Sequence, residues 1–107
     1  MSVLRLAISC PLRSLFDYLP PAGLTAEALD GLQPGVRVRV DFGRRQLQGW
    51  LIEIAAESAV PATSLRAAQA VVDDAPLLSP WVLQLCRWAA DYYQHPLGEV
   101  LEAAFPP

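Results

Sequence analysis

Three consecutive residues near the N-terminus, Phe16, Asp17 and Tyr18, place a carboxylate between two aromatic rings. An exposed aromatic ring can stack on any nucleobase, because every base presents a π-face. A carboxylate beside that ring is an acceptor-only group at neutral pH and can accept a hydrogen bond from a sugar hydroxyl. Together these groups could hold the end of a nucleic-acid strand. The alternative is a packing role, in which the aromatic residues belong to a core and the acid occupies a turn or a cap.

The composition is that of a globular segment with room for one core. The chain has 107 residues, of which 53% are hydrophobic and 18% are charged, and a chain of this length forms one domain rather than two. No apolar run approaches the roughly 18 residues needed to cross a bilayer, and the N-terminus lacks the pattern of a signal peptide. We therefore expect a cytoplasmic protein.

Side chains that could support catalysis are scarce. All eight basic residues are arginines, so the sequence lacks the lysine of a phosphate-binding P-loop and any Schiff-base lysine. It also contains no GxSxG elbow and no HExxH zinc motif. Cys10 and Cys86 are expected to be reduced thiols, and with the single His95 they fall short of the about four ligands that a structural zinc needs. We expect no enzyme activity, metal or cofactor in this segment.

The charges are distributed unevenly along the chain. The formal net charge of −3 argues against a protein that binds a long duplex through many phosphates. Residues 1–66 carry seven arginines against six acids, whereas residues 67–107 carry one arginine against five acids. Four arginines lie within nine positions: Arg37, Arg39, Arg44 and Arg45. Such a basic edge suits contact with a few phosphates, for which Arg44 and Arg45 are the candidates; ordinary solvated arginines on a strand are the alternative.

Short strands in the N-terminal third would position the aromatic and acidic residues. Residues 3–8 are predicted to form a strand whose side chains alternate between its two faces, and residues 15–19 form a second extended piece that two prolines close. The inward-facing residues of the first strand would be Leu4, Leu6 and Ile8. The connection over residues 22–34 has room for a short helix, with Thr25 as its N-cap and Gly31 as its stop.

The pattern from residue 36 to residue 54 predicts an antiparallel hairpin. Residues 36–41 alternate between valines and charged residues, and residues 49–54 form the return strand. The turn residues would be Phe42, Gly43, Arg44 and Arg45. One face of the return strand would carry Trp50, Ile52 and Ile54. Residues 65–72 are expected to form a further strand, although their alanines leave a helix as the alternative.

Ser79 followed by Pro80 predicts the start of a helix, and Pro96 ends it. Apolar residues at helical spacing form one face of this helix: Trp81, Leu85, Trp88, Ala89 and Tyr92. An aromatic stripe with this spacing is usually a packing surface, so we expect these residues in the core. Several short strands and one C-terminal amphipathic helix predict a mainly β fold, a small antiparallel barrel of the OB type.

Four blocks of sequence, taken in order, resemble a known family. They are FDY at 16–18, PGVRV at 34–38 with Phe42 and Gly43 ahead of Gly49, WAADYY at 88–93, and HPLG at 95–98 with Val100. This arrangement resembles the N-terminal 3′-end DNA-binding domains of the bacterial primosomal protein N′ family, the PriA replication-restart helicases, over essentially the whole chain. The resemblance implies a DNA 3′-terminus-binding domain at residues 1–105, with residues 106–107 starting a linker to a helicase body.

The resemblance also implies a pocket for the 3′ end of the nascent leading strand at a stalled fork, bound without base specificity. Its residues would be Phe16, Asp17, Gly43 and Arg66. Asp17 would accept a hydrogen bond from a 3′-hydroxyl and repel a 3′-phosphate, and Gly43 would let the backbone approach the nucleotide. Arg66 would reach a base or phosphate, or pair with Asp17 in the free protein. Tyr18 points away from Asp17 by the alternation of the strand and would belong to the core.

For the full-length protein, the resemblance implies an ATP-dependent 3′-to-5′ DNA helicase, with ATP, Mg²⁺ and zinc bound outside this segment. The implied partners are a DNA 3′ end at branched or forked DNA and, through the full-length protein, other primosome or single-strand-binding proteins, with no membrane. The alternative hypothesis is a protein-interaction barrel that docks a replication partner or regulates the helicase body. The acidic C-terminal part and the low net charge favour that alternative.

Overall fold

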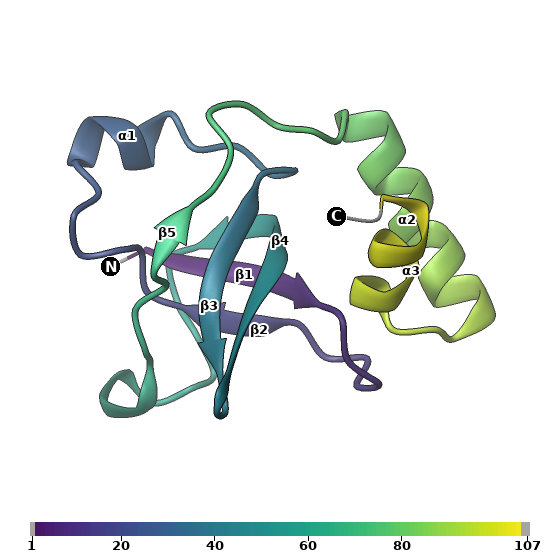
Figure 1. The fold of residues 1–107 in the computed structure, drawn as a ribbon, viewed down its shortest axis with the longest axis horizontal. Helices are drawn as coiled ribbons and strands as arrows, with labels where there is room; N and C mark the ends of the chain where they lie inside the picture. The colour runs from purple at the N-terminus through teal and green to yellow at the C-terminus, as the bar shows by residue number, and fades with distance from the viewer. Residues whose placement is uncertain (1, 106–107) are drawn as a thin grey trace.

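A computed structural model describes residues 2–105, and within them one five-stranded antiparallel sheet has the strand order β2-β1-β4-β3-β5 (Figure 1). The strands are β1 (Val3–Ile8), β2 (Phe16–Tyr18), β3 (Arg37–Phe42), β4 (Arg45–Ala55) and β5 (Ala70–Val71). The helices are α1 (Ala26–Asp30), α2 (Pro80–Tyr93) and α3 (Leu97–Ala104), with a 3-10 turn, η1, at Ala62–Ser64. The predicted mainly β, OB-like fold is confirmed. The predicted linker residues 106–107 lie outside the described residues.

The two edges of the sheet are joined through the segment that precedes β5. Leu19, directly after β2, forms a parallel bridge with Ala67. Its amide donates a hydrogen bond to the carbonyl of Arg66, and its carbonyl accepts one from the amide of Ala68, both at 2.8 Å. β5 itself pairs with β3, so the sheet closes into a small barrel and leaves few unpaired edge groups. The strand predicted at residues 65–72 is therefore divided into two short extended pieces, and the alternative of a helix there is wrong.

The interior of the barrel is filled by alternate residues of the strands. The predicted inward-facing residues are confirmed, because the following residues are at most 2% exposed: Leu4, Leu6, Ile8, Val36, Val38 and Val40. The opposite face of β1 is also buried at Val3 and Ala7. Burial of this apolar surface, at about 25 cal/mol per Å², is the main force that holds the barrel together. Tyr18 belongs to the same core, as predicted, and its hydroxyl donates a hydrogen bond to the carbonyl of Asp41 at 2.8 Å. The buried phenol is thus satisfied.

β3 and β4 form the predicted hairpin, with a tighter turn than expected. Phe42 pairs with Arg45, so the connection consists of Gly43 and Arg44 alone. Gly43 has φ of 63°, in the left-handed region that glycine adopts without a steric penalty. The hairpin tip is therefore narrow, and β4 begins at Arg45 rather than at residue 49.

β4 contains one extra residue, Ile52, where its register against β1 shifts. A bulge of this kind displaces the alternation of the following residues by one position. Ile54 consequently lies opposite Leu4, and the prediction that it shares a face with Trp50 and Ile52 is wrong. Trp50 and Ile52 pack outside the barrel, against the helices.

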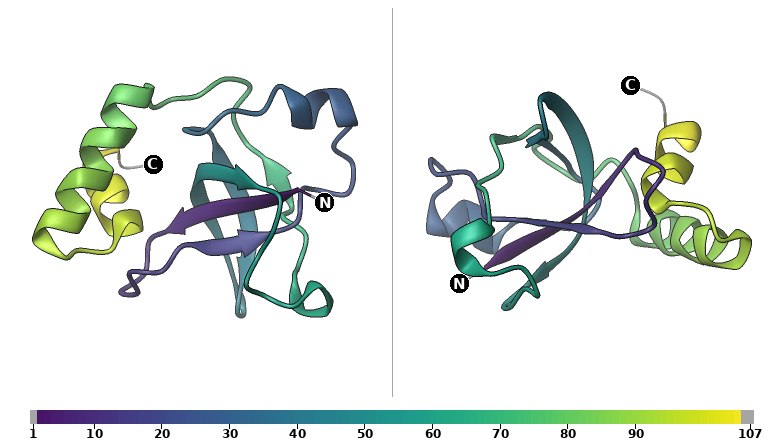
Figure 2. Two further views of the ribbon diagram at one scale, coloured as in Figure 1. Left: turned by 180° about the vertical axis from the view of Figure 1, so that it is seen from behind. Right: turned by 90° about the horizontal axis from the view of Figure 1, so that it is seen from below.

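Local hydrogen bonds start the helices where the sequence predicted. The hydroxyl of Thr25 accepts from the amide of Ala28 at 3.1 Å, and the hydroxyl of Ser79 accepts from the amide of Val82 at 3.2 Å. The predicted C-terminal helix, α2, is followed by a second one, α3. These two lie together on one side of the barrel, and α1 lies at the other end of the molecule (Figure 2). No helix in the described part of the chain is long and apolar enough to cross a membrane.

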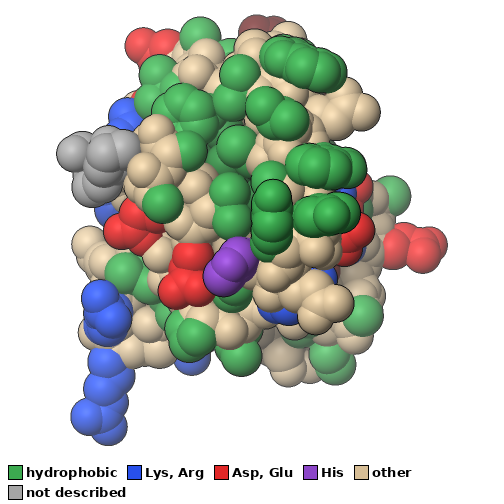
Figure 3. Space-filling model, turned by 90° about the vertical axis from the view of Figure 1, so that its right-hand side faces the viewer, with side chains coloured by type: hydrophobic (Ala, Val, Ile, Leu, Met, Phe, Trp, Pro, Cys, Tyr) green, Lys and Arg blue, Asp and Glu red, His purple; other side chains and the backbone are tan. Residues whose placement is uncertain are grey.

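The aromatic stripe of α2 faces solvent, which corrects the prediction that it is core. Leu83 of α2 packs in a cluster with residues of the barrel and α3, and Ala90 is the other buried residue of this helix. The predicted core face is instead largely exposed, with Trp81 at 70%, Leu85 at 49%, Trp88 at 58% and Tyr92 at 66%, while Ala89 is half-buried. Figure 3 shows hydrophobic side chains gathered on this side of the molecule. α2 has apolar residues on two of its faces, and the face that contacts the barrel and α3 is the buried one.

Gly98, in α3, lies against the end of β1. A Cβ at this position would overlap the carbonyl of Ile8. A Gly-to-Ala change inside a helix normally stabilises the helix by about 1 kcal/mol. At position 98, however, the added Cβ would clash with the backbone of Ile8, so α3 would have to move away from β1. We expect Gly98→Ala to lower the free energy of unfolding by about 1–3 kcal/mol, measured by urea denaturation.

The matched control is Gly23→Ala, because a Cβ on Gly23 meets no atom within 4 Å. This change should shift the free energy of unfolding by less than about 1 kcal/mol. A Gly98→Ala protein as stable as the Gly23→Ala protein would contradict the close packing of α3 on β1.

Candidate nucleic-acid-end site

A cavity of about 320 Å³ lies beside β2 and is lined by three of the four predicted site residues, Phe16, Asp17 and Arg66. The remaining lining residues are Leu15, Tyr18, Ala59, Val60 and Ser64. β2 supplies Phe16 and Asp17, whereas Arg66 arrives from the segment whose backbone pairs with Leu19. The closure of the barrel therefore brings together residues that are about fifty positions apart in the sequence.

Phe16 and Asp17 point to opposite faces of β2. Phe16 lies opposite Leu6 and Asp17 opposite Arg5 in the pairing with β1. The ring of Phe16 packs edge-on against Phe42, with 4.9 Å between the ring centroids. β2 pairs with only one other strand of the sheet, so residues from both of its faces can border the cavity.

Gly43, the fourth predicted site residue, is not among the residues that line the cavity. It directly follows Phe42, whose ring contacts Phe16. The position of a Cβ on Gly43 faces open space, so its backbone is accessible to an approaching ligand. The structure thus places the hairpin tip next to the Phe16 ring but outside the cavity.

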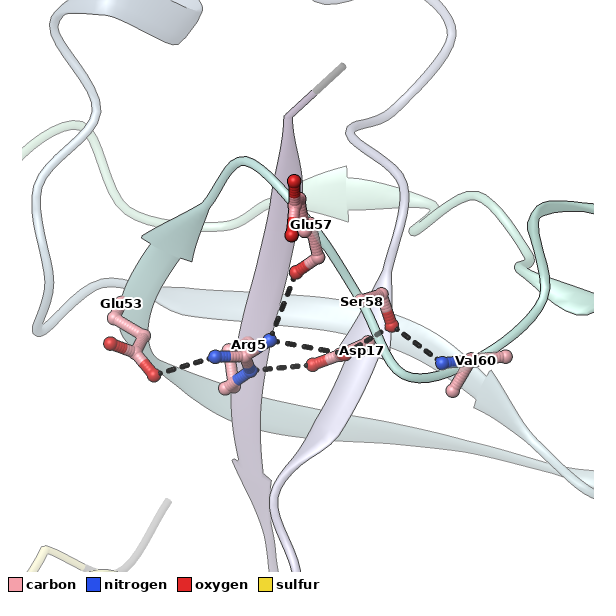
Figure 4. A network of polar contacts seen from close by, with 6 residues as sticks. All are labelled: Arg5, Asp17, Glu53, Glu57, Ser58 and Val60. Carbon is pink, nitrogen blue, oxygen red and sulfur yellow. Dashed lines mark hydrogen bonds and ion pairs between the residues drawn. The ribbon is translucent and has the colours of Figure 1, made fainter.

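The carboxylate of Asp17 is bound by Arg5, on the neighbouring strand (Figure 4). Arg5 Nε donates to Oδ1 at 2.8 Å and Nη2 donates to Oδ2 at 3.3 Å, a two-point arrangement that matches the planar guanidinium to the planar carboxylate. The hydroxyl of Ser58 also donates to Oδ2. Among the described residues Arg66 forms no ion pair with Asp17, so the expected pairing of these two residues in the free protein is wrong.

Arg5 and Ser58 are absent from the sequence prediction of the site. Arg5 could have been found from the alternation of residues 3–8, since it is the charged residue on the outward face of β1 and lies directly opposite Asp17. That inference needs the register between β1 and β2. Ser58 lies in a loop after β4, and no local pattern in the sequence marks its contact with Asp17.

These contacts set the ionisation of Asp17. Hydrogen bonds from Arg5 hold the pKa of Asp17 below its ordinary value, with a further contribution from Ser58, while burial opposes them. Asp17 is therefore ionised at neutral pH although its side chain is only 10% exposed. Three donors occupy the two carboxylate oxygens, which offer about four acceptor positions. By this count, one acceptor position of Asp17 has no donor among the described residues.

The four clustered arginines have different environments. Arg37 is committed to the fold: Nε and Nη2 donate to Asp73 at 3.0 and 2.7 Å, and its amide donates to the same carboxylate at 2.8 Å. Within residues 2–105 the other three form no ion pair and are exposed: Arg39, Arg44 and Arg45. Figure 3 shows basic side chains projecting at the lower end of the molecule, where Figure 1 draws the β3–β4 turn.

The side chains at the site are of types that can bind the parts of a nucleotide. The described residues contain no group of three His, Cys, Asp or Glu side chains that could hold a metal ion. The cavity brings together an ionised acceptor, an aromatic ring and a guanidinium, which are groups that can bind a sugar hydroxyl, a base and a phosphate, respectively. The fold and the site define a small β-barrel binding domain.

Comparison with known proteins identifies the family. Residues 5–106 match the family described as the 3′DNA-binding domain (3′BD) of PriA, and the chain belongs to this family. The chain is also 38% identical over 106 residues to the replication restart protein PriA of Haemophilus influenzae. That match covers 99% of the chain and 14% of the length of the relative. The resemblance inferred from the sequence is confirmed.

The Arg37–Asp73 pair should make stability depend on pH. Hydrogen bonds from Arg37 hold the pKa of Asp73 below its ordinary value, so the stabilisation is complete above the unfolded-state pKa of about 4 and is lost as the pH falls through the lower native pKa. We expect Asp73→Asn to lower the free energy of unfolding by about 1–3 kcal/mol at pH 7.

The measurement is urea denaturation of both proteins from pH 7 down to pH 3. The difference between them should narrow below about pH 4. A difference that stays constant over this range would show that the charge of Asp73 contributes nothing to the fold.

Proposed function

We propose that this domain binds the free 3′ end of a DNA strand at branched or forked DNA during replication restart, without selecting the terminal base. The observation that carries the proposal is the ionised Asp17, with one free acceptor position, in a cavity shared with Phe16 and Arg66. Membership of the 3′DNA-binding domain family supports the same assignment.

Asp17 distinguishes an end from a continuing chain by charge. A 3′-hydroxyl can donate a hydrogen bond to the free acceptor position, whereas a 3′-phosphate carries negative charge and no equivalent donor at neutral pH. Two like unit charges about 4 Å apart repel each other by roughly 4 kcal/mol at an effective dielectric constant of 20. Arg5 reduces this repulsion, but Glu53 is bound to the other side of Arg5, so the three groups together remain negative.

The chemistry of the cavity lining supports the proposed tolerance of the terminal base. Phe16 offers a ring that can contact any base, since stacking does not depend on the hydrogen-bonding edge. The residues that line the cavity include no Asn or Gln, whose amides read the edge of adenine, and the proposal directs Asp17 and Arg66 to the sugar and the phosphate rather than to a base edge. In the proposal Arg66 contacts the phosphate of the terminal nucleotide, and the Gly43 backbone approaches its sugar.

The proposal extends to the full-length protein, of which this chain corresponds to a small part in its relative. There we propose an ATP-dependent 3′-to-5′ helicase of the cytoplasm, with ATP, Mg²⁺ and zinc bound by segments other than this one. The 3′-end domain would direct that helicase to forks that carry a free nascent end. Primosome or single-strand-binding proteins would be its partners through the full-length chain.

Replacing Asp17 tests the end-reading role directly. The unchanged domain should bind an oligonucleotide with a 3′-hydroxyl at least about tenfold more tightly than the same oligonucleotide with a 3′-phosphate, a difference of about 1.4 kcal/mol. Asp17→Ala should remove this preference, as measured by fluorescence anisotropy. Asp74→Asn is the matched control, because Asp74 is exposed and lies outside the cavity.

Equal binding of the two oligonucleotides by the unchanged domain would refute the role of Asp17. A domain that bound neither oligonucleotide but bound another replication protein would favour the alternative of a protein-interaction barrel. Circular dichroism of each variant shows whether the fold is retained.

The hairpin arginines should contribute affinity without contributing end preference. Arg44→Gln and Arg45→Gln should each weaken binding to both oligonucleotides equally and reduce the slope of log K against log salt by about 0.7, the value for one phosphate contact on a single strand. Arg87→Gln, on α2 and away from the hairpin tip, should leave the slope unchanged. An unchanged slope in the Arg44 and Arg45 variants would place the hairpin tip away from the DNA.

A further inference from the structure

Arg5 joins three separate parts of the chain at the rim of the candidate site (Figure 4). Its guanidinium donates to Asp17 on β2, to Glu53 Oε1 on β4 at 2.9 Å, and to the carbonyl of Glu57 in the following loop at 3.2 Å. That loop continues through Ser58 to Ala59 and Val60, and the last two line the cavity. Arg5 therefore contacts both the proposed recognition group and the loop that forms one wall of the cavity.

We propose that Arg5 is the positioning residue for 3′-end recognition: it fixes the plane of the Asp17 carboxylate and holds the loop at residues 57–60 against the site. This inference rests on the proposed function of Asp17. It assigns to Arg5 a role through other groups, without contact between Arg5 and the DNA.

The geometry restricts which acceptor position stays open. The terminal torsion of an Asp side chain is broad, so an unsupported carboxylate would present its lone pairs in many directions. Arg5 binds both oxygens and removes this freedom. Ser58 fixes the remaining side of Oδ2, because its hydroxyl donates to Asp17 and accepts from the amide of Val60 at 3.0 Å. The hydrogen bond to a 3′-hydroxyl then has one defined direction, so less freedom is lost on binding.

The hydrogen bonds of Arg5 leave little capacity for a phosphate. The guanidinium has five N–H donors, and four hydrogen bonds to Asp17, Glu53 and Glu57 engage it. Arg5 is also not among the residues that line the cavity. The two acidic partners neutralise its charge, which further weakens any attraction to DNA.

The preference for a 3′-hydroxyl end should require the planar guanidinium of Arg5, and not only its positive charge. A lysine at this position would keep a positive charge but would present a point charge on a flexible stem, which cannot bind both oxygens of Asp17 in a fixed plane. Arg5→Lys and Arg5→Met therefore separate the charge from the geometry.

The test measures the ratio of Kd values for the 3′-phosphate and 3′-hydroxyl oligonucleotides with Arg5→Lys, Arg5→Met and the unchanged domain. We expect the ratio to fall about tenfold in Arg5→Met and by an intermediate factor in Arg5→Lys. Carbon-13 NMR of the Asp17 carboxyl should show a higher pKa in Arg5→Met than in the unchanged domain. In an Asp17→Asn background, Arg5→Met should change the affinity for either oligonucleotide less than about twofold, since coupled residues are not additive.

Two results would overturn the inference: an unchanged ratio in Arg5→Met, or an equal loss of affinity for both ends that persists in the Asp17→Asn background. The second result would make Arg5 a direct phosphate contact. If Arg5→Met fails to fold, Arg5→Lys provides the test. A fully retained ratio of Kd values in Arg5→Lys would show that the planar guanidinium is not required and would overturn the inference. A missing preference in the unchanged domain would instead refute the proposed function itself, so the two failures are distinguishable.

Discussion

The backbone pairing between Leu19 and residues 66–68 determines where the candidate site can form. Two hydrogen bonds of 2.8 Å join the end of β2 to a segment that belongs, through β5, to the opposite edge of the sheet. Without them β2 would be held on one side only, and Arg66 would have no fixed relation to Phe16 or Asp17. Barrel closure and site assembly are therefore the same event. It follows that the site cannot be carried by the N-terminal strands alone.

Within that frame, β2 directs its side chains alternately to the barrel core and to the polar network around Arg5. Tyr18 is anchored in the barrel by its buried ring and its hydrogen bond to the carbonyl of Asp41, and Phe16 packs on Phe42 at the barrel end. Asp17 points the other way, to the polar network. A strand of three residues thus contributes Phe16 and Tyr18 to the barrel core from one face and Asp17 to the polar network from the other, and residues of both faces border the candidate cavity. Because β2 has only three residues, no other residue of the strand could replace Asp17 in the polar network or Tyr18 in the core.

The sequence predicted features that depend on local rules. The inward-facing residues of 3–8 and 36–41 and the caps at Thr25 and Ser79 were predictable because they follow from the two-residue repeat of a strand and from hydrogen bonds within one turn. Features that depend on a distant partner were not. The bulge at Ile52 is defined only against β1, and the covered stripe of α2 is selected by the barrel and α3. For the candidate site, the family resemblance implied Phe16, Asp17, Gly43 and Arg66, whereas the long-range contact of Arg5 with Asp17 required the β1–β2 register.

The outward orientation of the α2 stripe gives the domain two independent optical reporters. Trp50 is buried between the barrel and the helices, with its ring edge-on to Phe105 at 6.1 Å, whereas Trp81 and Trp88 lie in solvent. A soluble quencher should reach the two α2 indoles and spare Trp50, so the emission that remains in its presence follows the barrel–helix packing. The emission that the quencher removes comes from the two α2 indoles and responds to contacts made with α2. Spectra with and without the quencher therefore distinguish a change inside the fold from an event on its exposed aromatic face.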